Sequence, residues 1–195
     1  MTLHPQDVVV VLKLLARSET ARSQRWTYAE LSQDLFMSTS QVFNSVARAE
    51  KALLLASVAG PNLDSPELSN DDPRIWLFPH RNNLKEFLIH GVKYVFPVER
   101  GGSTRGVPTA EGALPLSKHF PQNFHLLPVW PHAAGLHRGI SFSPIYKNVP
   151  QAALKDEKLY ELLSLLDAIR EGRAREREIA IRELTARIDS RDNST

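Results

Sequence analysis

Two predicted helix starts, close together in the sequence, constrain this chain more than any other feature. Thr27 is followed three residues later by Glu30, and Ser38 is followed at the same spacing by Gln41. This is the pattern of a capping box, in which both side chains accept hydrogen bonds from backbone amides at a helix N-terminus. Only two residues separate Leu35 from the second cap. The stretch therefore predicts a helix, a tight turn and a second helix.

The second of these helices, expected over residues 38–54, has an apolar side and a polar side. The residues expected to face the core are Val42, Val46, Ala49 and Leu53. The polar side chains expected to point away from it are Thr39, Ser40, Gln41, Asn44, Ser45 and Arg48. The second helix of a helix-turn-helix enters the major groove, where Gln and Asn pair with adenine and Arg with guanine. These polar residues are the predicted contacts to double-stranded DNA. The alternatives are an ordinary polar helix face or a domain that binds protein.

The flanking residues extend this motif toward a winged helix. A helix is expected from Pro5, a favoured first helical position, with Asp7 in its first turn. Residues 56–60 and 75–78 have the pattern of two strands, and residues 61–74 between them have the composition of a loop. Three helices followed by a hairpin are typical of a winged helix-turn-helix. The loop is rich in Asp and Glu, which would repel DNA phosphates.

The remainder predicts a small β segment and further helices, so the expected fold class is α+β. The expected elements are a helix over 82–90 that ends at Gly91, strands over 92–96, 124–130 and 139–142, and helices over 159–169 and 173–188. The predicted division is a winged helix-turn-helix domain at 1–92, a proline-rich β segment at 93–150, and a C-terminal helical region at 151–195 for dimerisation or partner binding.

The composition narrows the class of protein further. The chain has 195 residues, of which 42% are hydrophobic, and it has no cysteine. Disulfides, thiolate zinc sites and cysteine nucleophiles are thereby excluded, and the composition agrees with a reducing compartment. The longest apolar run near the N-terminus, Val8–Leu12, is too short for a membrane span or a signal peptide. We expect a cytoplasmic protein with no membrane partner.

A glycine-rich segment over residues 100–106 is the second candidate site. Its possible phosphate or nucleic-acid contacts are Arg100, Ser103, Thr104 and Arg105. Glycines allow close backbone approach, and amides with arginines hold phosphates. Residues 101–150 also carry four basic side chains against one acid, Glu111. The segment lacks the spacing of a Walker loop, and the alternative is a glycine-rich turn between strands.

No set of residues predicts catalysis, a metal site or a cofactor, and we expect no enzyme. Four histidines accompany Glu111, namely His119, His125, His132 and His137. Their spacings match no helical ligand pair, so they are expected to be scattered loop residues. A cluster of four arginines, Arg170, Arg173, Arg175 and Arg177, alternates with glutamates. We expect these arginines to form solvated pairs on a helix face.

Several local patterns match a known class of protein. They are Tyr-Ala-Glu-Leu-Ser at 28–32, Met-Ser at 37–38, and Val-Ala-Arg-Ala-Glu-Lys-Ala-Leu-Leu at 46–54. Through them, residues 5–78 resemble winged helix-turn-helix transcription regulators, loosely of the MarR type. Residues 94–97, 104–109 and 172–178 look like segments of little-characterised bacterial proteins assigned to such regulators. That second resemblance implies no ligand or activity for residues 97–195.

The leading expectation is a sequence-specific bacterial transcription regulator. It would be a homodimer that reads a palindromic operator with residues 38–54, because protein symmetry and operator symmetry match. Its C-terminal part would dimerise or hold an effector or a protein partner. One alternative is an antitoxin-like protein whose C-terminal part covers a toxin, or an adaptor whose winged helix binds protein. Another is a nucleotide-binding protein or enzyme that uses residues 100–106.

Overall fold

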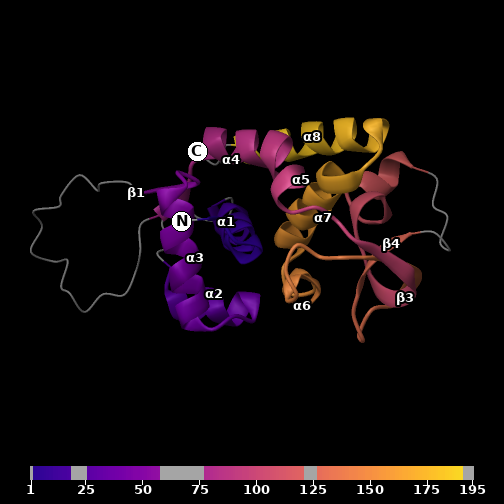
Figure 1. The fold of residues 1–195 in the computed structure, drawn as a ribbon, viewed down its shortest axis with the longest axis horizontal. Coiled ribbons are helices and arrows are strands. Elements are labelled where there is room, and N and C mark those ends of the chain that lie inside the picture. Colours follow the sequence, from indigo (N-terminus) through magenta and orange to yellow (C-terminus); the bar gives the residue numbers. More distant parts are fainter. Residues whose placement is uncertain (1, 19–25, 58–76, 121–126, 191–195) are drawn as a thin grey trace, which may run out of the picture.

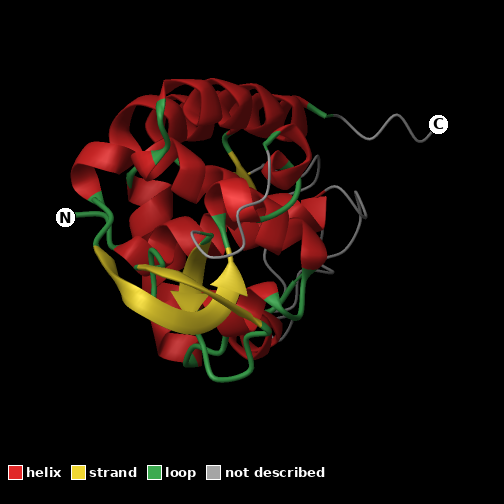
Figure 2. Cartoon of the chain, turned by 90° about the vertical axis from the view of Figure 1, so that its right-hand side faces the viewer, coloured by secondary structure: helices red, strands yellow, loops and turns green. Residues whose placement is uncertain are grey.

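The computed structural model describes residues 2–18, 26–57, 77–120 and 127–190 as a mixed helical and β structure. Figure 1 shows helices α1 to α3 at one end, a small barrel at the other and α7 between them. Figure 2, viewed from the barrel end, shows the barrel strands beneath the C-terminal helices. The expected α+β class is confirmed. Within these ranges, every helix is too short or too polar to cross a membrane.

The N-terminal part contains the two helices that their caps predict. Its elements are α1 (Pro5–Ser18), α2 (Tyr28–Leu35), α3 (Thr39–Lys51), β1 (Leu55–Ser57) and β2 (Leu77–Pro79). Both capping boxes form as predicted. The turn from α2 to α3 begins at Phe36, which adopts a left-handed φ of 54°. β1 and β2 pair antiparallel. The predicted loop at 61–74 and the adjoining strand ends lie outside the described residues.

The prediction that the second helix runs to residue 54 is wrong at its C-terminal end. α3 ends at Lys51, and Leu53 adopts a φ of 59°. The chain turns there to enter β1, so the side chain of Leu53 is 66% exposed and Leu54 is buried in its place. Leu53 was expected in the core because the helical spacing was continued one turn too far.

The helical segment after β2 is longer than its sequence suggests. It consists of α4 (Arg81–Glu86), a π-helical turn η1 (Phe87–Gly91) and α5 (Val92–Val95). The predicted helix stop at Gly91 and the predicted strand over 92–96 are therefore wrong. Leu84, Leu88 and Val92 are fully buried at intervals of four residues. The wider π turn keeps this apolar face on the core across the glycine.

The proline-rich region forms a three-stranded barrel. Its strands are β3 (Arg100–Pro108), β4 (Pro128–Pro131) and β5 (His137–Phe142), with the short 3₁₀ turns η2 (Ala110–Gly112) and η3 (Leu116–His119) after β3. β3 runs antiparallel to β4 and β5, which are parallel to each other, and the barrel is closed. Strands were predicted at the positions of β4 and β5. Residues 124–126 of the first prediction lie outside the described residues.

Three helices complete the chain: α6 (Val149–Ala153), α7 (Glu157–Glu171) and α8 (Ala174–Asp189). Gly172 ends α7, as predicted. Every residue from Leu162 to Arg170 is buried, so α7 is enclosed on all sides and not only along its predicted apolar face. One hydrophobic core extends from α1 through α7 to α8. The three predicted segments of the chain share this core.

Candidate nucleic-acid interface

The N-terminus of α3 is fixed in place by hydrogen bonds at both ends of the Gln41 side chain. Its Oε1 accepts from the Ser38 amide at 3.0 Å, and the Gln41 amide donates to Ser38 Oγ at 3.2 Å. Its Nε2 donates to the Tyr146 hydroxyl at 3.2 Å. The Asn148 side chain donates to the carbonyl of Phe36 in the turn before α3. The segment between β5 and α6 therefore holds the start of α3 in place, and Gln41 is less free to contact DNA than predicted.

The outward face of α3 carries three of the six predicted contacts. Thr39, Ser40 and Asn44 are exposed, as the helical pattern predicted. Phe43 lies among them with 53% of its surface exposed, and its ring packs edge-on against Tyr28 at 5.3 Å between centroids. Burial raises the pKa of Tyr28, and the nearby charge of Glu50 raises it further. The accessible face of α3 is thus polar at its N-terminus and aromatic at its centre.

Ser45 and Arg48 do not point away from the core, and the prediction of their orientation is wrong. Ser45 is fully buried, and it accepts a hydrogen bond from Arg48 Nη2 at 3.2 Å. The Arg48 guanidinium donates to both carboxylate oxygens of Asp7 in α1, at 2.8 and 2.6 Å. Asp7 is fully buried, and a buried carboxylate needs a charged partner. Arg48 therefore secures α3 against α1, and the hydrogen bond to Asp7 raises its pKa.

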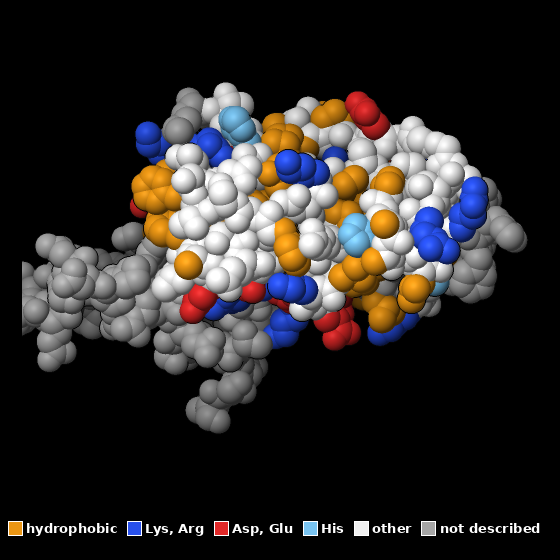
Figure 3. All heavy atoms as spheres, turned by 90° about the horizontal axis from the view of Figure 1, so that it is seen from below, with side chains coloured by type: hydrophobic (Ala, Val, Ile, Leu, Met, Phe, Trp, Pro, Cys, Tyr) orange, Lys and Arg blue, Asp and Glu red, His pale blue; other side chains and the backbone are white. Residues whose placement is uncertain are grey.

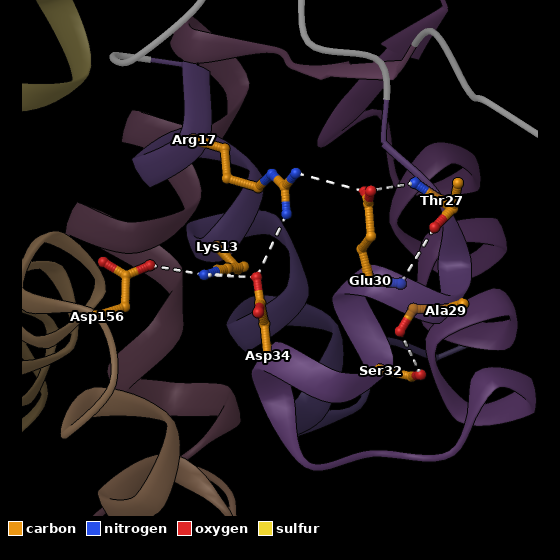
Figure 4. A network of polar contacts seen from close by, with 8 residues as sticks. All are labelled: Lys13, Arg17, Thr27, Ala29, Glu30, Ser32, Asp34 and Asp156. Atoms are coloured by element: carbon orange, nitrogen blue, oxygen red, sulfur yellow. Dashed lines mark hydrogen bonds and ion pairs between the residues drawn. The ribbon is translucent and has the colours of Figure 1, made fainter.

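A second polar network joins α2 to the rest of the molecule (Figure 4). Lys13 in α1 lies between Asp34 in α2, at 2.9 Å, and Asp156 before α7, at 2.7 Å. Burial alone would raise the pKa of Asp156, but hydrogen bonds from Lys13 and the Leu159 amide outweigh it and the pKa is lowered. Arg17 continues the network to Asp34 at 3.3 Å and to Glu30 at 3.5 Å. The buried ammonium group of Lys13 thus links α2 to the start of α7.

The charge around α3 is mixed. Its first turn, from Thr39 to Val42, is uncharged, which leaves the positive end of the helix dipole open to an anion. Glu30 on α2 and Glu50 on α3 are exposed, and Lys51 is exposed beside Glu50. Phosphate attraction at α3 would therefore come from the helix terminus and from uncharged donors.

The second candidate segment is a strand, so the expectation of a glycine-rich turn is wrong. Arg100 lies at one end of β3, where it pairs with Glu171 at 2.8 Å. Ser103 Oγ accepts a hydrogen bond from Arg138 Nε at 3.2 Å. Thr104 is half-buried, and Arg105 is exposed directly opposite Arg138 on β5. The structure therefore separates Arg100 from the other predicted residues and brings Arg138, which was not predicted, to Arg105.

The arginine cluster of the C-terminal helices is not uniformly solvated, because Arg170 is buried. Its Nη1 donates to Asp167 Oδ1 at 2.6 Å, and its other nitrogens donate to the carbonyls of Phe96 and Pro97. Asp167 Oδ2 accepts from Thr109 at 2.8 Å and from the Trp130 indole at 2.6 Å. Burial raises the pKa of Asp167 despite these partners. This network fastens the barrel to α7, and the sequence offered no local signal for it.

A pocket of about 400 Å³ opens between the 3₁₀ turns and the first turn of α7. Its walls include the apolar residues Ala113, Leu114 and Leu127, and Tyr160 lies on the α7 side. Burial raises the pKa of Tyr160 to about 12, and its hydroxyl donates to the Pro108 carbonyl at 2.7 Å. Tyr160 therefore remains a neutral donor at physiological pH. The volume is that of a small-molecule site.

The histidines do not assemble a metal site within the described part of the chain, where no three His, Asp or Glu side chains gather as ligands. His125 lies outside that part. No protein-family model matches the sequence, and comparisons with curated proteins and with solved structures find no similar protein.

Proposed function

We propose that this chain is a sequence-specific DNA-binding transcription regulator with an N-terminal winged helix-turn-helix. The observation that carries the proposal is the geometry of α2 and α3. Both helices begin with a capping box, a tight turn joins them, and the antiparallel strands β1 and β2 follow them. In the helix-turn-helix class, residues at the start of the second helix contact base edges. The uncharged first turn of α3, at the positive end of the helix dipole, suits that position.

The proposed contact set is smaller than the sequence suggested. Thr39, Ser40 and Asn44 form its polar part, since they are exposed on α3. Asn44 would pair with an adenine edge, and Phe43 would contact a thymine methyl. Arg48 is assigned to holding α3 on α1, because both of its bidentate bonds go to Asp7. A homodimer reading a palindromic operator of the MarR-like kind remains part of the proposal.

Selection from a random duplex pool, followed by binding measurements, tests this proposal. The chain should enrich a palindrome, and Asn44→Ala should lower affinity for it by about 5- to 150-fold, the equivalent of 1–3 kcal/mol for a bidentate base contact. Gln33→Ala, an exposed amide on α2, is the matched control and should bind like the unaltered chain. Failure to enrich any sequence, or equal binding by Asn44→Ala, would reject α3 as the reading helix.

A second candidate function is binding to a protein, as in an adaptor or an antitoxin-like protein. The observation that favours it is apolar exposure beside α3: Phe43 is 53% exposed, Leu53 is 66% exposed and Phe78 on β2 is 37% exposed. The acids Glu30 and Glu50 nearby oppose phosphate binding. DNA binding that is weak and insensitive to salt would support this function, because phosphate contacts give a steep dependence on salt.

A further inference from the structure

We propose that the β3–β5 ribbon of the barrel is a second DNA contact, in which Arg105 and Arg138 bind the phosphate backbone of the same duplex beyond the site read by α3. The inference rests on the proposed DNA-binding function and adds a partner surface to it. The two guanidinium groups come from separate strands, and their register brings them together.

The strand pairing places the two arginines on the same face at short range. Arg105 and Arg138 are directly opposite in the antiparallel register of β3 and β5. The carbonyl of Arg105 accepts from the His132 amide, at 3.2 Å, on the side away from β5. The pair is thus of the non-hydrogen-bonded kind, in which opposite Cα atoms lie about 4.5 Å apart and side chains are closest. Gly106 and Gly139, which follow the two arginines, let the segment from Leu127 to Trp130 pack closely against β3 and β5, because a Cβ at either glycine would collide with a carbonyl of that segment.

Like charges directly opposite each other across two strands are unfavourable unless an anion lies between or above them. Both side chains are exposed, and within the described ranges neither forms an ion pair. Arg138 Nε instead donates to Ser103 Oγ, on the same face of the ribbon. This bond orients one guanidinium and leaves its remaining N–H groups free for an external acceptor. A phosphate oxygen is the acceptor that suits a pair of such groups.

The ribbon and the start of α3 lie at opposite ends of the long axis, and both reach the same side of the molecule. In Figure 1 both the turn between α2 and α3 and the barrel reach the lower side, and Figure 3 shows that side with Lys and Arg side chains adjacent at the barrel end. β5 leads directly to Tyr146, which binds Gln41 at the start of α3. Because α3 and the barrel lie at opposite ends of the long axis, only a duplex that extends well beyond the site read by α3 would reach the ribbon.

The test compares Arg105→Gln and Arg138→Gln with the unaltered chain on the selected site, in a duplex of about 30 bp and in one trimmed to the site. Arg182→Gln, an exposed arginine on α8 at the top of Figure 1, is the matched control for loss of one charge. Each ribbon variant should reduce the log–log salt slope by about 0.9, which corresponds to about eightfold weaker binding at 0.1 M salt. The loss should be equal for all sequences and absent on the trimmed duplex.

Other outcomes separate this inference from the proposed function. If both ribbon variants lose no more affinity than Arg182→Gln, while Asn44→Ala loses the selected site, the ribbon proposal is overturned and the function stands. If the ribbon variants weaken binding and Asn44→Ala leaves sequence preference intact, the ribbon proposal holds and α3 is not the reading helix. If the unaltered chain binds no duplex, both proposals are overturned.

Discussion

The pair of Arg48 and Asp7 gives a sharp test of how α3 is held. Arg48→Ala would remove both guanidinium bonds to a carboxylate that is fully buried in the first turn of α1. Among the described residues, Asp7 would keep only the hydrogen bond from the His4 amide, at 2.8 Å. Removing one partner of a buried ion pair costs about 3–5 kcal/mol, because the other charge stays buried without compensation. The side chain of Arg48 is 12% exposed, so water reaches this site and the lower figure of about 3 kcal/mol applies.

Thermal unfolding followed by circular dichroism measures this effect. For a chain of this size, about 1 kcal/mol shifts the melting temperature by about 2–4 °C, so Arg48→Ala should lower it by about 6–12 °C. The double variant Asp7→Leu with Arg48→Met should recover much of the loss, since it removes both charges and fills the space with apolar groups. Asn44→Ala, on the exposed side of the same helix, should leave the melting temperature within about 1–2 °C, as expected of a surface substitution.

The contrary result would have a definite meaning. If Arg48→Ala melted like the unaltered chain and yet lost DNA binding, Arg48 would be a DNA contact and its bonds to Asp7 would not exist in solution. Loss of stability together with weakened binding at low temperature, where the variant is still folded, would show that the orientation of α3 matters for recognition.

The remaining predictions concern the barrel and the network of Lys13. Gly106→Ala should destabilise the chain by more than 2 kcal/mol in urea unfolding, because a Cβ there would lie 2.0 Å from the Trp130 carbonyl oxygen; Gly102→Ala, with open space around it, should stay within about 0.5 kcal/mol. A large effect at Gly102 or none at Gly106 would contradict the barrel geometry. The lowered pKa of Asp156 means that its ion pair contributes fully above the ordinary pKa of about 3.9 and is lost as pH falls through the lower folded value. The difference in unfolding free energy between the unaltered chain and Asp156→Asn should therefore be constant from pH 7 to about pH 5 and vanish in acid; a difference that grew in acid would refute this assignment.

Features that depend on nearby residues were predictable from the sequence. The capping boxes at Thr27 and Ser38 formed as expected because each consists of two residues three positions apart. The end of α7 at Gly172 was predicted for the same reason. Where a local sequence pattern was compatible with both a strand and a helix, the prediction was wrong. Val92 begins a run of β-branched and aromatic residues typical of a strand, but Leu84, Leu88 and Val92 share a buried helical face through a π turn.

The candidate site was predictable only in part, because its errors involve partners distant in sequence. Arg48 and Ser45 lie on the polar side of α3 in any helical projection, and nothing near them indicates that Asp7, 41 residues earlier, is buried against that side. Similarly, the glycine-rich pattern made Arg105 a candidate. Its neighbour Arg138 is 33 residues later in the sequence, and only the register of β3 and β5 brings the two side chains together.

The polar contacts of α1 indicate how the two proposed DNA contacts would keep a fixed spacing. α1 holds α3 through Asp7 and Arg48, and holds both α2 and the start of α7 through Lys13. α7 in turn holds the barrel through the buried Asp167, which accepts hydrogen bonds from Thr109 and Trp130. Each of these links is buried or mostly buried, and each would leave an unpaired charge or polar group if it opened. The proposed reading face of α3 and the arginines of the ribbon are thus attached to one core. If the spacing is fixed, affinity should fall when the DNA between the two contacts bends in a way that does not fit the protein. Because DNA bending depends on sequence, affinity should then depend on base pairs that no side chain touches.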